Sequence, residues 1–207
     1  SARPGQRIIA LGKEHLRVCV PPDGFRVAVE NLTFERIDFV WQSAEAPPGF
    51  PPAMIVIRTR RTTFARCQFL GEGERVRPLA ILLDSSASTT TGGAHAADAV
   101  GSDALAAGRV DASDVVFQGV SAGVAVRRAA AWAIVFDNAL HLGPGPLVWL
   151  AQPPQPETPL RLHANAVTLR GGGPLLECPT PPAEGAAGEL SIVADASVFA
   201  PLAGEPL

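Results

Sequence analysis

Short apolar runs recur along the whole chain, most of them about four to six residues long. Gly, Pro, Asn or Asp separates one run from the next, and Pro or Gly interrupts nearly every longer window. No stretch keeps the period of about 3.6 residues that an amphipathic helix requires over several turns. The pattern therefore predicts a chain built of short β-strands.

In each repeat, a polar residue is followed three or four positions later by an apolar one. The six segments are Asn31–Phe34, Arg61–Phe64, Asp114–Phe117, Asp137–Leu142, Ala164–Leu169 and Ala194–Phe199. Their polar positions, 31, 61, 114, 138, 165 and 195, are 30, 53, 24, 27 and 30 residues apart. We interpret the interval of 53 as two units, one of which has a divergent turn. Asn and Asp tolerate left-handed backbone, so we expect the Asn and Asp positions at tight bends between two strands.

Two further sets of apolar runs follow the same repeat. One set covers residues 53–57, 79–83, 123–126, 146–150 and 174–178, and the other covers 26–29, 132–136, 160–162 and 190–193. Each unit of about 24 to 30 residues thus carries three short strands. Units of this kind bury their inner faces only by stacking on one another, which aligns similar residues in columns.

Two inward columns are expected from this stacking. The first contains Leu32, Phe34, Phe64, Phe117, Leu142, Leu169 and Phe199, and the second contains Ile55, Ile57, Ile81, Leu83, Val124 and Val126. Residues 31–39 also match residues 61–69 at an offset of 30, which aligns Ile37 with Cys67. The Cys67 side chain is therefore expected to point inward.

In segments such as residues 29–39 the chain resembles the pectate-lyase-like β-helix repeat proteins. The resemblance extends over about residues 7–207 and concerns the repeat pattern. It implies an all-β fold, a single-stranded right-handed parallel β-helix of about six to seven coils. We expect one domain over residues 1–207, interrupted by a long insertion at 84–108. Because Pro206-Leu207 looks like the start of another strand, we expect the domain to be a fragment of a longer chain.

The alternative fold is an antiparallel β-sandwich. A sandwich requires hairpin turns such as Asn-Gly or Asp-Gly between paired strands. Asp23-Gly24 is the closest case in this sequence. The β-helix is therefore the favoured prediction.

Composition excludes several classes of protein. The chain has 207 residues, of which 47% are hydrophobic and 18% charged, so it is not intrinsically disordered. A net charge of -3 does not fit nucleic-acid binding. No apolar run approaches the length of a membrane span, so we expect no membrane insertion. The three widely spaced cysteines form no zinc motif, and we expect no metal and no cofactor.

Two groups of residues are candidates for ligand binding. Arg58, Arg60 and Arg66 form, with Arg61, the one basic cluster of the sequence, and guanidinium groups bind carboxylate-bearing sugars well. The alternative is that these arginines pair with Glu30, Glu35 or Asp38 on neighbouring coils. In the 84–108 insertion, His95 and Asp98 could bind a metal or a sugar, although its composition is also typical of a flexible spacer.

The favoured function is a non-catalytic structural or interaction module. Its partner would be a polysaccharide, another protein or another domain of the same parent chain. The alternatives are a pectate-lyase-like carbohydrate-active enzyme and an extracytoplasmic module that senses a ligand through the insertion. No catalytic residue is assigned, because strand carboxylates such as Asp84 and Glu177 are sparse and unpaired. The resemblance favours an extracytoplasmic location.

Overall fold

The computed structural model describes residues 6–11, 14–28, 31–43, 51–58, 60–73, 76–84, 108–128, 131–181 and 188–200. All regular secondary structure in these ranges is β-strand. A 12-stranded sheet contains, in order, β1 (Gln6–Ile9), β4 (Asn31–Glu35), β7 (Arg61–Ala65), β10 (Gly108–Gln118), β12 (Trp132–Leu142), β14 (Leu160–Asn165) and β17 (Leu190–Asp195). The same sheet includes β2 (Leu16–Val20), β5 (Ile37–Trp41), β8 (Gln68–Gly71), β15 (Thr168–Arg170) and β18 (Val198–Ala200).

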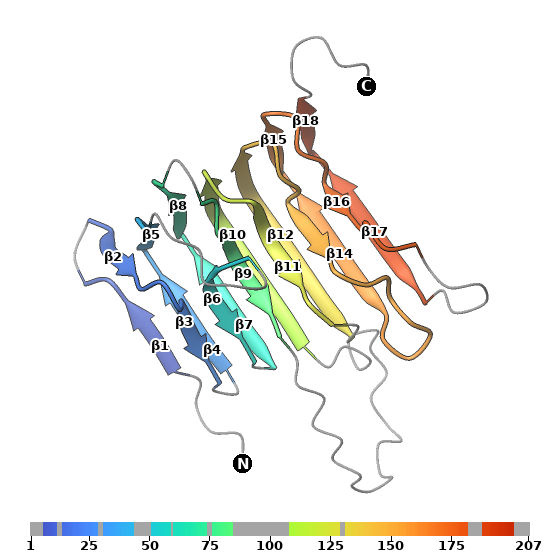
Figure 1. Ribbon diagram of the computed structural model, residues 1–207, viewed down its shortest axis with the longest axis horizontal. Coiled ribbons are helices and arrows are strands. Elements are labelled where there is room, and N and C mark those ends of the chain that lie inside the picture. The colour runs from blue at the N-terminus through green and yellow to red at the C-terminus, as the bar shows by residue number, and fades with distance from the viewer. Residues whose placement is uncertain are drawn as a thin grey trace, which may run out of the picture.

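A second, 6-stranded sheet lies opposite and completes the coils. It contains β3 (Phe25–Val27), β6 (Ala53–Ile57), β9 (Leu79–Leu83), β11 (Ala122–Val126), β13 (Val148–Leu150) and β16 (Leu176–Glu177). Every pairing between these named strands is parallel, as in β4 with β7 and β6 with β9. The chain therefore advances from one end of the molecule to the other as a parallel β-solenoid of about five turns (Figure 1). The antiparallel sandwich is excluded for the described strands.

The sequence analysis placed one turn too many between positions 61 and 114. Strand β10 pairs directly with β7, where Ala112 lies beside Phe64, and with β8, where Phe117 lies beside Phe69. Since Arg61 pairs with Arg109, the interval between positions 61 and 114 contains one turn and not two. A single turn is this long because it also contains the 84–108 insertion, most of which lies outside the described residues.

From β4 onward, each turn of the 12-stranded sheet bends at one non-glycine residue with left-handed backbone. These residues are Arg36, Arg66, Asp114, Asn138, Ala166 and Ala196, with φ between 47° and 58°. The expected bends at positions 114 and 138 are confirmed. Those at Asn165 and Asp195 were placed one residue early, and the one at Asn31 was wrong, because this residue begins β4.

The bend fixes which side chains enter the core. Counted from the left-handed residue, the side chains four and two positions before it point inward, and so do those one and three positions after it. For Arg66 these are Thr62, Phe64, Cys67 and Phe69, all 0% exposed. The residues of the first predicted column consequently belong to three columns: Leu32 lies four residues before the bend, Phe34 and Phe64 two before it, and Phe117, Leu169 and Phe199 three after it. Phe34 stacks on Phe64 before the bend, and Phe39, Phe69 and Phe117 stack after it at centroid distances of 5.2 and 5.1 Å.

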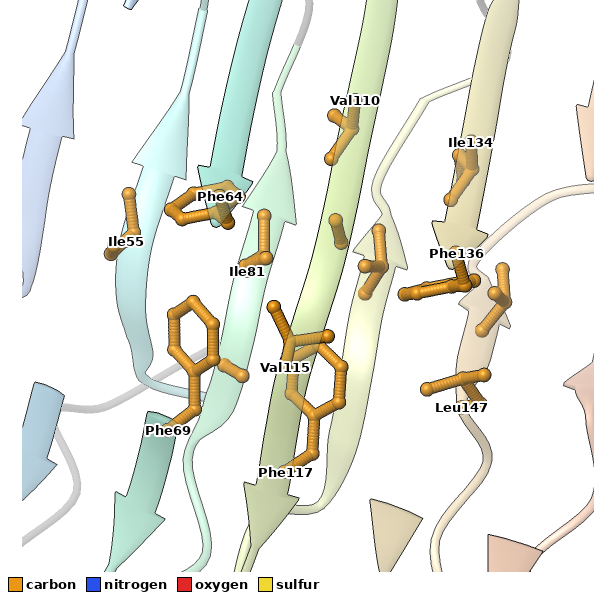
Figure 2. Close-up of a cluster of buried hydrophobic side chains, with 14 of the residues drawn as sticks. Ile55, Phe64, Phe69, Ile81, Val110, Val115, Phe117, Ile134, Phe136 and Leu147 are labelled. Atoms are coloured by element: carbon orange, nitrogen blue, oxygen red, sulfur yellow. The ribbon is translucent and has the colours of Figure 1, made fainter. Parts of the chain in front are cut away.

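Most other core predictions agree with the structure. Ile55, Ile81 and Val124 are register partners, as are Ile57, Leu83 and Val126, and all six are buried. Figure 2 shows Ile55 and Ile81 on one side of the core, facing Phe64, Phe69 and Phe117. Cys67 points inward as expected. Leu142 was wrong, because His141 occupies the inward position three residues after the bend at Asn138, and Leu142 lies beside Arg170.

Candidate functional site

The outward side of the first four strands of the 12-stranded sheet carries polar residues, and we call it the polar face. It consists of Arg7 from β1, Asn31, Thr33 and Glu35 from β4, Arg61 and Thr63 from β7, and Arg109 and Asp111 from β10. The residues point outward because they alternate with the buried ones. Register then aligns them: Arg7, Thr33, Thr63 and Asp111 form one row along the solenoid axis.

A shallow hollow of about 320 Å³ lies on the polar face. It is lined by Arg7, Asn31, Leu32, Thr33, Arg61 and Thr63, which come from three neighbouring strands. The threonine hydroxyls and the Asn31 amide supply both hydrogen-bond donors and acceptors. The two arginines add planar groups with several N–H donors each. The hollow is therefore suited to a ligand that has hydroxyl and carboxylate groups.

Both carboxylates of the polar face are held by arginines. Asp111 accepts hydrogen bonds from Arg61 Nη2 at 3.0 Å and from Arg109 Nε at 2.8 Å. Glu35 accepts from Arg7 Nη2 at 3.1 Å and also from Arg66. Four guanidinium groups thus surround two carboxylates, so this part of the surface has an excess of positive charge.

The positive groups are also the more accessible ones. The side chains of Arg7 and Arg61 are 61% and 57% exposed, whereas those of Glu35 and Asp111 are 14% and 19% exposed. Each arginine keeps N–H groups that its carboxylate partner does not occupy. An approaching anion therefore meets guanidinium groups first.

A second set of ion pairs lies beyond the bend. His15 Nδ1 lies 2.6 Å from Asp38 Oδ1, and Arg17 pairs with Glu72. Gln42 donates to Glu72 at 3.1 Å, and this hydrogen bond together with Arg17 lowers the pKa of Glu72. These contacts join neighbouring coils at the surface.

The arginines predicted from the sequence do not form one site. Arg58 Nη2 pairs with Asp84 Oδ2 at 2.8 Å, between the ends of β6 and β9. Arg60 precedes β7 and Arg66 follows it, so their backbones lie about 20 Å apart along the strand. Arg66 pairs with Glu35, which was the alternative expected for this cluster. His95 and Asp98 lie outside the described residues.

Most of the hollow was missed from the sequence. Arg61 belonged to the basic cluster, but Arg7, Asn31, Thr33 and Thr63 were not singled out. The match of residues 31–39 with 61–69 contained a signal, because it aligns Thr33 with Thr63. Arg7 had no such signal, since β1 pairs with β4 at an offset of 26 residues instead of 30.

Cys67 and His141 are buried ionisable residues that point into the core, on the inward side of the 12-stranded sheet. Burial raises the pKa of the Cys67 thiol to about 11, and its Sγ lies 3.6 Å from the Phe34 carbonyl oxygen. Burial lowers the pKa of His141, whose Nε2 donates to the Gly145 carbonyl at 2.7 Å. Among the described residues no group of His, Cys, Asp and Glu side chains could hold a metal ion.

The geometry defines the chain as a parallel β-solenoid with a polar, arginine-rich strip on one sheet. Comparison with protein-family models, with curated proteins and with solved structures gives no match for the chain. The pectate-lyase-like superfamily therefore stays an expectation from the repeat pattern. The described part of the chain has no helix that is long and apolar enough to cross a membrane.

Proposed function

We propose that the chain is a non-catalytic interaction module that binds an extended acidic polysaccharide on its polar face. The hollow lined by Arg7, Asn31, Thr33, Arg61 and Thr63 is the observation that carries this proposal. It combines exposed guanidinium groups with hydroxyl and amide groups, which is the chemistry that a uronic-acid polymer requires.

The rows of the polar face favour a long ligand over a small one. Neighbouring strands of the sheet, which we call rungs, lie about 4.8 Å apart. Each of the first four rungs contributes one residue to the row of Arg7, Thr33, Thr63 and Asp111. A polymer that lies along the solenoid axis would contact one rung after another. The hollow is shallow, so affinity would come from several weak contacts in sequence, which is typical of a binding surface along a solenoid.

The arrangement of the carboxylates supports binding over catalysis. Glycoside hydrolysis generally requires two carboxyl groups that face each other across the scissile bond. Here Glu35 and Asp111 instead point to arginines, each with two guanidinium partners. The oxygens of both carboxylates are thus engaged by guanidinium groups of the same surface.

Titration calorimetry with oligogalacturonate tests the proposal, with the fully methyl-esterified oligomer as the neutral control. We expect the acidic oligomer to bind and the ester to bind at least about tenfold more weakly. Arg61→Gln should weaken binding by about tenfold or more, whereas Arg170→Gln, on an exposed position of β15, should not change it. Equal affinity for both oligomers, or an unchanged affinity of Arg61→Gln, would contradict the proposal.

The second candidate is a pectate-lyase-like carbohydrate-active enzyme. The observation in its favour is that polar side chains do gather on one lateral sheet, around Asp111 and the four arginines. The same oligogalacturonate samples, incubated with Ca²⁺ and assayed for unsaturated uronate products, separate the two candidates. Product formation that is lost in Asp111→Asn would favour the enzyme.

A further inference from the structure

Both ends of the 12-stranded sheet are open strand edges. At one end β1 pairs only with β4 and β2 only with β5, and at the other β17 pairs only with β14 and β18 only with β15. Each edge therefore presents backbone N–H and C=O groups without a strand partner among the described residues. Such edges add further strands unless charges, proline or a covering segment prevent it.

Apolar side chains are exposed at both edges. At the end formed by β17 and β18, which we call the C-terminal edge, the exposed residues are Leu190, Ile192, Val193, Val198 and Phe199, at 41–58%. At the end formed by β1 and β2, the N-terminal edge, Ile8 is 46% and Leu16 is 49% exposed. Asp195 is the one charged residue within β17 and β18, so the C-terminal edge has little of the charge that usually protects an edge strand.

The two edges share one register. Following the strand pairs through the sheet, Ile8 belongs to the same inward column as Ala194. Val18 likewise belongs to the column of Phe199. If β1 of a second copy continued the sheet beyond β17, Ile8 would pack on the small Ala194, and Val18 of β2 would pack on Phe199. The strands would also run in the same direction.

The outward charges of the two edges are complementary in the same arrangement. Arg7 reaches diagonally to Glu35 on the next rung, at 3.1 Å. Asp195 occupies on β17 the register position that Glu35 occupies on β4. The strand pairs connect the two residues through Ala65, Ser113, Asp137 and Asn165. On a stacked copy, Arg7 would therefore lie between Glu35 on its own chain and Asp195 on the neighbouring chain.

From these observations we infer that copies of this chain associate end to end, with β1 and β2 of one copy adding to β17 and β18 of another. The contact is heterologous, so it leaves a free edge at each end and permits further addition. In this arrangement β3 of one copy lies two rungs from β16 of the other, so the 6-stranded sheet is not continued directly. The contact is confined to the 12-stranded sheet, and we expect reversible association.

Sedimentation velocity over a concentration series, with the whole chain, tests this inference. The wild type should show an average mass that rises with concentration. Ile8→Lys blocks the N-terminal edge, and Ile192→Lys blocks the C-terminal edge, because each places a charge in an inward column of an edge strand. Each variant alone should remain monomeric. Val135→Lys, on the outward side of the central strand β12, is the matched control and should associate like the wild type.

A mixture of the two blocked variants gives the decisive result. The C-terminal edge of Ile8→Lys and the N-terminal edge of Ile192→Lys are both intact, so the mixture should form dimers and nothing larger. Circular dichroism verifies that both variants keep the β-sheet spectrum of the wild type. A wild type that stays monomeric, a mixture that stays monomeric, or a single blocked variant that dimerises through like edges would overturn the inference.

Discussion

The first and the last rungs of the solenoid share one backbone register but carry different side chains. On the outward side, Thr33, Thr63 and Asp111 of the early rungs are replaced in the same row by Val135, His163 and Val193. The ion pairs of the polar face are confined to the early rungs. The late rungs therefore keep the architecture without the arginine-rich surface.

The inward side changes as well. Phe34 and Phe64 occupy the column in which Ala164 and Ala194 lie further along. Stacked rings on adjacent rungs contribute about 0.5–1.5 kcal/mol per pair beyond their burial, which alanine cannot supply. Each rung therefore fixes the direction in which a side chain points, but not which residue supplies it. Surface chemistry and core packing can therefore vary from rung to rung while the coil stays the same.

Truncating the aromatic stack should have the largest effect on stability. Phe69 is 0% exposed and lies between Phe39 and Phe117, whereas Phe199, in the same column, is 43% exposed at the edge. We expect Phe69→Ala to reduce the free energy of unfolding by about 3–5 kcal/mol, through lost contacts and a cavity. Phe199→Ala should cost less than about 1 kcal/mol. Urea unfolding followed by circular dichroism measures both, and equal losses would show that the last rung is packed like the first ones.

A glycine column after the bend should give the next largest difference. Gly71, Gly119, Gly143 and Gly171 each lie five residues beyond the left-handed residue of their turn. Gly119 has φ +67°, and a Cβ there would lie 2.2 Å from the Gly71 carbonyl oxygen. For Gly143 the nearest atom would be 3.8 Å away. We expect Gly119→Ala to cost about 2 kcal/mol or more and Gly143→Ala less than about 0.5 kcal/mol, both measured by urea unfolding.

The fold was predictable because strand alternation and the repeat leave a strong pattern. Ile55, Ile81 and Val124 could be assigned to one column from their positions alone, and Cys67 from its match with Ile37. The number of turns between positions 61 and 114 was not, because the insertion lengthens a single turn until it resembles two. His141 was missed because a polar residue in an alternating strand indicates the outward side, and its hydrogen bond to Gly145 depends on tertiary structure.

The candidate site was less predictable than the fold. The hollow joins side chains from three strands, and which of them become neighbours depends on strand register. Arg7 meets Thr33 only because β1 pairs with β4 at an offset that differs from the repeat. The basic cluster around Arg60 was visible in the sequence, but neighbours along a strand point to alternating sides or lie far apart. Proximity in the sequence is therefore a poor guide to a site that lies across strands.

The smallest of the three effects concerns His141, which lies in the column of the phenylalanine stack. Its Nε2 donates to Gly145, and its buried Nδ1 has no hydrogen-bond partner among the described atoms. Protonation would place an N–H without an acceptor in the core, beside Phe117 at a ring distance of 6.2 Å. Burial accordingly lowers the pKa of His141 below its ordinary value of 6.5.

The sign of the pH effect follows from this shift. Below pH 6.5 the unfolded chain binds a proton at His141 that the native state does not yet bind, so stability falls as the pH decreases towards the lowered native pKa. For one proton the slope is at most about 1.4 kcal/mol per pH unit. Urea unfolding at a series of pH values from neutral to mildly acidic measures this slope.

Two variants assign the slope to this residue. His141→Gln keeps a side-chain donor for the Gly145 carbonyl and removes the titrating group, so the dependence on pH should become flatter. His163→Gln is the matched control, since His163 is an exposed histidine on the neighbouring strand β14. It should leave the slope of the wild type unchanged. If His163→Gln flattened the slope and His141→Gln did not, the buried imidazole would not be the group that causes the pH dependence of stability.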